Sequence, residues 1–163
     1  MPNLTPTFSE RHLAIIASEL FGIEGEVSPL VSFEDQNARI KTADGSYVLK
    51  IANKRWGISE LRMQAEALKY LEEVAPDFIL PRVIPTKSGE TITFVDDFPV
   101  RLITYIEGNI FADVPKTPEL YRDLGNYMGR FNKAMQGFSH PASFRPDDMW
   151  ILDNVLACKT YVA

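Results

Sequence analysis

Hairpin-turn signals fall into two groups along the chain, and one helical stretch separates them. Asp44-Gly45 joins two runs of β-forming residues, and turns at 87–89 and at Asp96-Asp97 separate three more. Between the groups, apolar residues recur at helical spacing from about Ile58 to Val74. Because turns this short connect antiparallel strands, both groups predict hairpins rather than parallel crossovers.

Two further helices are expected on either side of the strands. Thr7 and Glu10 have the spacing of a capping box, and Gly22 is a plausible end for the helix that follows. Thr117-Pro118 opens a second helix, with proline at the favoured first position. Strands and helices therefore occupy separate parts of the chain. The predicted fold class is α+β, with an antiparallel sheet of five or six strands.

The composition and charge of the chain disfavour or exclude several classes of function. The chain has 163 residues, is 45% hydrophobic and carries a formal net charge of -5, which disfavours electrostatic binding to nucleic acid or to acidic membranes. Its apolar runs are too short to predict a transmembrane helix. The single cysteine, Cys158, excludes an internal disulfide and a cysteine-rich zinc site. Residues 1–5 lack the pattern of a signal peptide, so we expect a cytoplasmic protein.

Lys50 stands inside an otherwise apolar strand, residues 47–51. A buried ammonium group needs an anionic partner or a route to solvent. Two interpretations follow: a lysine on an edge strand that faces water, or a lysine that contacts phosphate oxygens and is held by the next helix. Strand alternation puts Val48 on the same face, where it could pack against a nucleobase.

Four segments, taken in order, resemble a known family. They are SFEDQN at 32–37, YVLKIAN at 47–53, RLITYIEG at 101–108, and 124–132 with its two glycines. Together they resemble the N-terminal lobe of the aminoglycoside phosphotransferase and choline kinase superfamily, which has the protein-kinase-like fold. The resemblance is strongest to the branch with hydroxylysine kinase and the phosphotransferase domains fused to aminotransferases. It implies a nucleotide-binding N-lobe at 1–106, and a hinge, linker and the start of a truncated helical C-lobe at 107–163.

The resemblance implies a binding site for ATP or GTP with Mg2+. Lys50 would contact the α- and β-phosphates, and the loop at 32–37 would fold over the triphosphate. This loop has no G-x-G-x-x-G pattern and is acidic, so backbone N–H groups would have to bind the phosphates. The side chains of Ser32, Gln36 and Asn37 would assist them.

The partner of Lys50 departs from the family pattern. Related enzymes use a glutamate on the following helix, and here Gln64 occupies that position on the expected buried face. Glu60 lies one turn earlier and is the reserve candidate. A neutral glutamine would orient Lys50 less strongly than a carboxylate would.

The resemblance implies that the segment from Leu102 to Gly108 is the hinge between the two lobes. The resemblance implies that the Thr104 carbonyl and the Ile106 N–H bind the purine edge, with Val48 against the base and Ile103 behind it. The alternative from periodicity alone is a buried strand leading into a turn.

The family's catalytic loop, H-x-D-x-x-x-x-N, does not occur in the sequence, and no aspartate has an asparagine five places on. We therefore expect a fragment that binds nucleotide without turnover, with no catalytic residue and no metal ligand of its own. The parent would phosphorylate a hydroxyl of an amino acid, amino alcohol or aminoglycoside-like substrate. Apolar faces on the helix from Thr117 and the segment from Met149 predict self-association into a homo-oligomer.

Two other functions stay open on the sequence. The acidic loop and Gln64 are compatible with a degenerate, non-catalytic nucleotide-binding or protein-interaction module. The third interpretation is an unrelated α+β protein in which Lys50 is only structural.

Overall fold

The structure is a computed structural model, and it describes residues 4–146 and 152–161. The elements up to the end of the sheet are, in chain order, α1 (Glu10–Ile16), a π-helical continuation η1 (Ala17–Phe21), β1 (Glu26–Leu30), β2 (Gln36–Lys41), β3 (Ser46–Ile51), α2 (Ile58–Val74), β4 (Val83–Ile84), β5 (Thr93–Val95) and β6 (Phe98–Thr104). The rest is η2 (Phe111–Asp113), α3 (Pro118–Met135), η3 (Pro141–Ser143) and η4 (Leu152–Tyr161).

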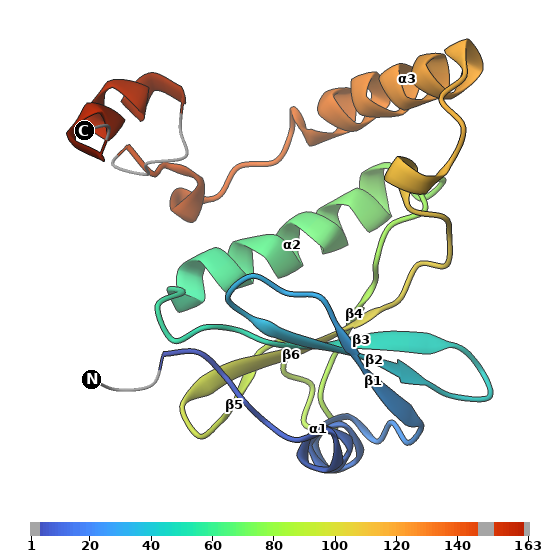
Figure 1. The fold of residues 1–163 in the computed structure, drawn as a ribbon, viewed down its shortest axis with the longest axis vertical. Coiled ribbons are helices and arrows are strands. Elements are labelled where there is room, and N and C mark those ends of the chain that lie inside the picture. Colours follow the sequence, from blue (N-terminus) through green and yellow to red (C-terminus); the bar gives the residue numbers. More distant parts are fainter. Residues whose placement is uncertain (1–3, 147–151, 162–163) are drawn as a thin grey trace.

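The strands form one six-stranded antiparallel sheet, which confirms the predicted α+β class (Figure 1). The strand order is β1-β2-β3-β6-β4, and β5 pairs with the remaining length of β6. β1 lies at the edge and contains Pro29 opposite Ala38, as expected for a residue that cannot donate to a ladder. Asp96 and Asp97 form the β5–β6 turn with positive φ angles of 49° and 64°.

α1 and η1 cover one side of the sheet, which we call the closed face (Figure 1). Leu13, Ile16 and Ala17 pack there with Leu49 and Leu102 in one buried cluster. Burial of these apolar side chains is the main contribution to the stability of the closed face.

The first helix begins later than its capping box predicts. The side chain of Ser9 accepts the hydrogen bond from the His12 N–H, so Ser9 is the N-cap and the expectation for Thr7 is wrong. Both residues can cap a helix, and the spacing alone does not distinguish them. Gly22 ends the helix in the left-handed conformation at φ 71°, as predicted.

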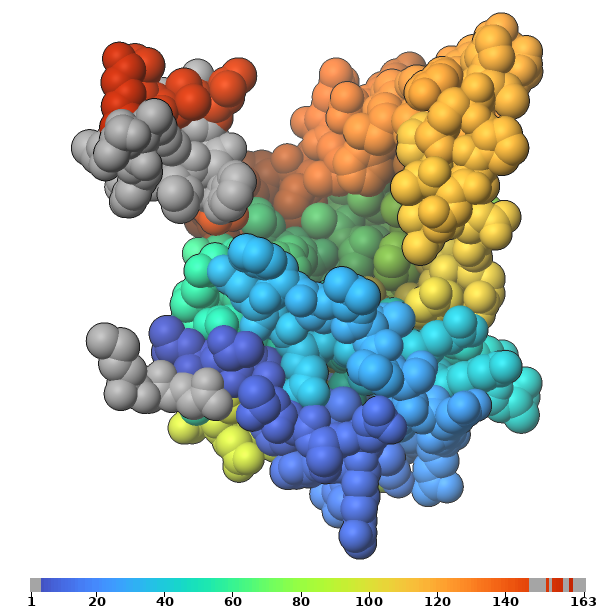
Figure 2. Space-filling model, viewed as in Figure 1, coloured from blue at the N-terminus to red at the C-terminus, as the bar shows by residue number. Residues whose placement is uncertain are grey.

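α2 lies on the other side of the sheet, which we call the open face (Figure 1). It begins at the N-cap Gly57, which offers no side-chain cap, and buries only Leu61, Ala65 and Leu71. In the space-filling view, atoms of α2 (green) lie at the bottom of a hollow between the loop before β2 (blue) and α3 (orange) (Figure 2).

α3 is attached to the end of α2 without burying any residue of its own. The Tyr70 hydroxyl donates to the Ala134 carbonyl at 3.0 Å, and the Phe78 ring meets Tyr127 edge to face. Leu124 and Met128 of the expected apolar stripe are exposed, whereas the apolar segment expected from Met149 begins outside the described residues. No helix in the described part of the chain is long and apolar enough to cross a membrane.

Candidate functional site

A row of three polar side chains crosses the open face of the sheet. Asn37 of β2 is paired with Lys50 of β3, and Lys50 is paired with Arg101 of β6. Directly paired residues of antiparallel strands lie on the same face with neighbouring side chains. We call these three residues the polar row.

Lys50 is held from the β2 side by an amide. Its Nζ donates to Asn37 Oδ1 at 3.1 Å. Asn37 is fixed in turn by Ser32, whose Oγ accepts from the Asn37 Nδ2 at 2.9 Å and from the Asn37 N–H at 3.2 Å. Three of the predicted site residues, Ser32, Asn37 and Lys50, are therefore brought together in one hydrogen-bonded chain.

Gln64 meets Arg101 rather than Lys50. Its Oε1 accepts from the Arg101 Nη1 at 2.9 Å, so the expected Lys50–Gln64 pair is not the one formed. Gln64 is exposed and not buried as helical spacing predicts, although it lines the pocket beside Lys50 and Arg101. The Glu60 carboxylate folds over Gly57 at the N-terminus of its own helix, where a methyl group on Gly57 would overlap it.

Arg101 is the site residue that sequence reasoning missed. The residue is only 7% exposed, and its Nε has no hydrogen-bond partner in the described part of the chain. The sequence contains a signal for this residue, because an arginine inside the apolar strand Phe98–Thr104 needs a partner for its buried charge, as Lys50 does.

The two cations share one electrostatic environment. Burial lowers the pKa of Lys50, the neighbouring charge of Arg101 lowers this pKa further, and Asp35 acts in the opposite direction. Burial also lowers the pKa of Arg101, again opposed by Asp35. Among the described residues, neither cation has a carboxylate within ion-pair distance. A bound anion would therefore favour the charged form of both.

The acidic residues of the loop before β2 are engaged with the chain after β3. Glu34 forms an ion pair with Arg55 at 2.6 Å, and Asp35 Oδ1 accepts from the Asn53 N–H at 3.0 Å. These contacts anchor the loop over the end of β3. The carboxylates that would repel a phosphate group are thus partly compensated by a cation and a backbone donor.

Gln36 lies apart from the other predicted loop residues. Its side-chain amide bonds the N–H and the carbonyl of Phe8, each at 2.7 Å. Alternation explains this placement, because Gln36 precedes Asn37 and so faces the closed side of the sheet.

An apolar row lies beside the polar row on the open face. Val48 is paired with Ile103, which is also paired with Val83, and all three are half-buried. One pocket joins the two rows; it is lined by Lys50, Gln64, Ala65, Leu68, Val83, Thr91, Arg101 and Ile103. Cations and an apolar wall thus share one cavity, which suits a ligand with both an anionic and a flat apolar part.

The predicted hinge, from Leu102 to Gly108, begins inside β6, which ends at Thr104, and Ile106 beyond the strand is exposed. The Arg39 guanidinium stacks on the Tyr105 ring, 4.1 Å from its centroid, and pairs with Glu107. The segment after β6 is therefore tied to β2, beside the pocket.

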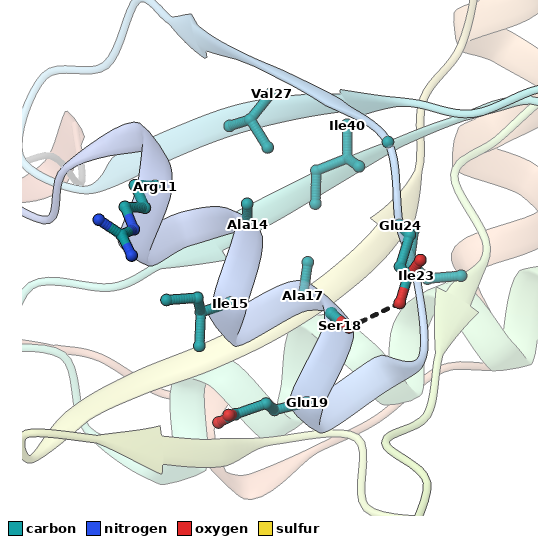
Figure 3. A pocket seen from close by; sticks show the side chains of 11 residues that line it. Arg11, Ala14, Ile15, Ala17, Ser18, Glu19, Ile23, Glu24, Val27 and Ile40 are labelled. Carbon is teal, nitrogen blue, oxygen red and sulfur yellow. Dashed lines mark hydrogen bonds between the residues drawn. The ribbon is translucent and has the colours of Figure 1, made fainter.

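A second hollow lies on the closed side of the sheet, between α1–η1 and β1 (Figure 3). The small residues Ala14 and Ala17 are part of its lining, and Ser18 donates a hydrogen bond to Glu24 across one end at 3.1 Å. Its charged side chains, Arg11, Glu19 and Glu24, are exposed. The sheet separates this hollow from the polar row.

Metal ligands are not clustered in the described part of the chain. Within residues 4–146 and 152–161, no group of three or more His, Cys, Asp or Glu side chains could hold a metal ion. The late aspartates Asp147 and Asp148 lie outside these residues.

Solved structures share this fold. An amicoumacin kinase in complex with AMP-PNP, Ca2+ and Ami superposes with a TM-score of 0.71 at 19% identity, covering 94% of this chain and 48% of that one. A spectinomycin phosphotransferase in complex with ADP and spectinomycin gives a TM-score of 0.66 at 12% identity, covering 97% and 48%. A microcompartment-associated aminopropanol kinase gives 0.65 at 16% identity, covering 90% and 48%. These likenesses confirm the predicted protein-kinase-like architecture.

The relatives found by sequence comparison are also kinases. Hydroxylysine kinase from Mus musculus is 28% identical over 179 residues, which cover 96% of this chain and 47% of that protein. The enzyme from Danio rerio is 23% identical, with 96% and 48% covered. The chain thus spans about half the length of the curated relatives it matches. The model of the phosphotransferase enzyme family matches residues 26–162, so the chain belongs to that family.

Proposed function

We propose that this chain is the nucleotide-binding part of an ATP- or GTP-dependent phosphotransferase that acts on small molecules. The observation that carries the proposal is the pocket in which Lys50 and Arg101 lie beside the apolar row. Two cations without a carboxylate partner, next to an apolar wall, match the triphosphate and the base of a nucleotide.

Each part of the nucleotide has a proposed contact. Lys50, held by Asn37, binds the α- and β-phosphates, and the loop at 32–37 covers them with backbone N–H groups. Val48 and Ile103 pack on the base, while the Thr104 carbonyl and the Ile106 N–H bind its edge. Mg2+ accompanies the nucleotide. In this proposal residues 1–106 form the nucleotide-binding lobe, and 107–163 the hinge and the start of a helical lobe.

The acceptor is proposed to be a hydroxyl of an amine-bearing small molecule. The relatives and structural neighbours are named for hydroxylysine, spectinomycin and aminopropanol, which supports this class. Phosphoryl transfer also requires a carboxylate that orients the hydroxyl and groups that hold magnesium. Because the sequence contains no H-x-D-x-x-x-x-N loop, we propose that these 163 residues alone bind nucleotide without turnover.

Calorimetric titration of Mg-ATP tests the proposal. The wild-type chain should bind, and Lys50→Met, which keeps the length of the side chain, should weaken binding by about tenfold or more, because a charge-assisted contact to phosphate is lost. Arg62→Gln removes an exposed cation from α2 and serves as the control with unchanged affinity.

Equal binding by wild type and Lys50→Met would remove the role of Lys50. A wild-type chain that binds neither ATP nor GTP, and associates as its concentration rises, would instead identify a non-catalytic interaction module.

A further inference from the structure

We infer that Arg101 is a second anion-binding residue beside Lys50, oriented by the neutral side chain of Gln64, and that the two cations together bind adjacent phosphate groups of a nucleotide. The inference deepens the proposed function and rests on it. It also gives a role to Gln64, which stands at the position where the family resemblance implies a glutamate.

The first observation that supports the inference is the position of Arg101 in the sheet. Arg101 is directly paired with Lys50 in the β3–β6 ladder, so the two side chains project side by side from the open face. Both line the same pocket. A diphosphate or triphosphate group that reaches one cation is therefore within reach of the other.

The second support is an unsatisfied donor. Arg101 is 93% buried, yet its Nε has no hydrogen-bond partner among the residues that the structure describes. Within the same residues its Nη1 meets only neutral oxygens, the Gln64 Oε1 at 2.9 Å and the Leu61 carbonyl at 3.5 Å. Buried polar groups are nearly always bonded, and buried charges are nearly always paired. An anion in the pocket would satisfy both requirements.

The third support is the chemistry of Gln64. An amide oxygen orients the guanidinium group without cancelling its charge, so Arg101 stays available to an anion. A glutamate at this position would form an ion pair with Arg101 and would neutralise it. The glutamine therefore leaves both positive charges available, whereas a glutamate at position 64 would leave only one in excess.

The alternative is a structural strut, in which Arg101 only ties β6 to α2. The two roles predict opposite results for Gln64→Glu. If Arg101 is a strut, a carboxylate strengthens the tie, raises the melting temperature and leaves nucleotide binding unchanged. If Arg101 binds the ligand, the same carboxylate competes with the phosphate groups and weakens binding.

The test is titration of the 163-residue chain with ATP and, separately, with tripolyphosphate. Gln64→Glu should weaken the binding of both by about tenfold. Gln64 is exposed, so this variant should fold. Ser59→Glu is the matched control: it adds the same charge to α2, but five residues earlier and about 140° around the helix, and should bind as wild type does.

Arg101→Met provides a second readout and should also weaken both ligands by about tenfold, with folding checked by circular dichroism. Wild-type affinity in Gln64→Glu would overturn the inference while leaving the proposed function intact, provided that the wild-type chain binds ATP. A wild-type chain that binds neither ligand would overturn both.

Discussion

The two faces of the sheet differ in their central residues although the same strands build them. On the closed face, Ala38, Leu49 and Leu102 have no exposed surface. One residue away in each strand, the open face presents Asn37, Lys50 and Arg101. A change of one position thus separates an apolar interior from a row of two cations and an amide, because successive side chains of a strand point to opposite sides.

The helices that cover the two faces account for this difference in exposure and charge. α1 lies on the closed face and buries Leu13 and Ile16 in the main cluster. α2 contributes the exposed Gln64 to the open face and leaves a pocket beside it. One face therefore supplies stability, while the other holds buried charge that costs stability and that a ligand can use.

The largest effect should come from truncating matched residues on the two faces. Leu49→Ala should lower the free energy of unfolding by about 3 kcal/mol, because it leaves a cavity in a fully buried site. Its neighbour Val48→Ala should cost about 1 kcal/mol, since Val48 is half-buried and fewer methyl groups are lost. Urea unfolding measures both, and equal losses would mean that the open face is packed as tightly as the closed one.

A second pair compares two residues adjacent in the sequence. Gln36→Ala should lower the free energy of unfolding by about 2 kcal/mol, because two hydrogen bonds to Phe8 are lost. ATP affinity should not change. Asn37→Ala should instead weaken ATP binding several-fold, because Lys50 loses its acceptor. A nucleotide defect in the Gln36 variant would contradict the assignment of that residue to the closed face.

The cost of the buried charge should appear in the pH dependence of stability. The pKa of Lys50 is lowered on folding, chiefly by burial. Between this lowered pKa and the ordinary value of about 10.4, the unfolded chain binds more protons, so raising the pH stabilises the fold. At lower pH the folded chain bears the full cost of the buried charge.

Lys50→Met should therefore be at least as stable as wild type at pH 7, and any advantage should shrink as the pH rises to 10. Urea unfolding at both pH values measures this, with Lys69→Met, on the exposed side of α2, as the control. A lysine variant much less stable than wild type at pH 7 would show that the charge stabilises the open face.

The smallest effect concerns the attachment of α3 on the open side. Asp77 and Arg130 form an ion pair, but both side chains are more than half exposed. Asp77→Asn should change the free energy of unfolding by only about 0.5 kcal/mol, and this difference should vanish in 1 M salt. A large loss that persists in salt would show that α3 is part of the cooperative core.

Local features of the fold were predictable because they depend on nearby residues. The Asp96-Asp97 turn and the Gly22 helix end were both expected, and the structure contains each of them. Lys50 was identified by the cost of placing a cation in an apolar strand. These inferences required only the residue and its immediate neighbours.

The site depended on contacts that sequence spacing does not encode. Helix periodicity put Gln64 on the sheet side of α2, but spacing does not tell which residue of the sheet its side chain reaches, and that residue is Arg101 rather than Lys50. Gln36 and Asn37 were expected to act together in one loop. The strand begins at Gln36, so alternation sends the two side chains to opposite faces.

The most direct test of the account is an NMR titration of the 13C- and 15N-labelled chain with ATP. Signals of Asn37, Val48 and Ile103 should shift, while those of Leu49 and Leu102, one residue away on the closed face, should shift far less. Shifts centred on Ala14 and Ala17, in the hollow beside α1, would place the nucleotide on the wrong side of the sheet and contradict the account.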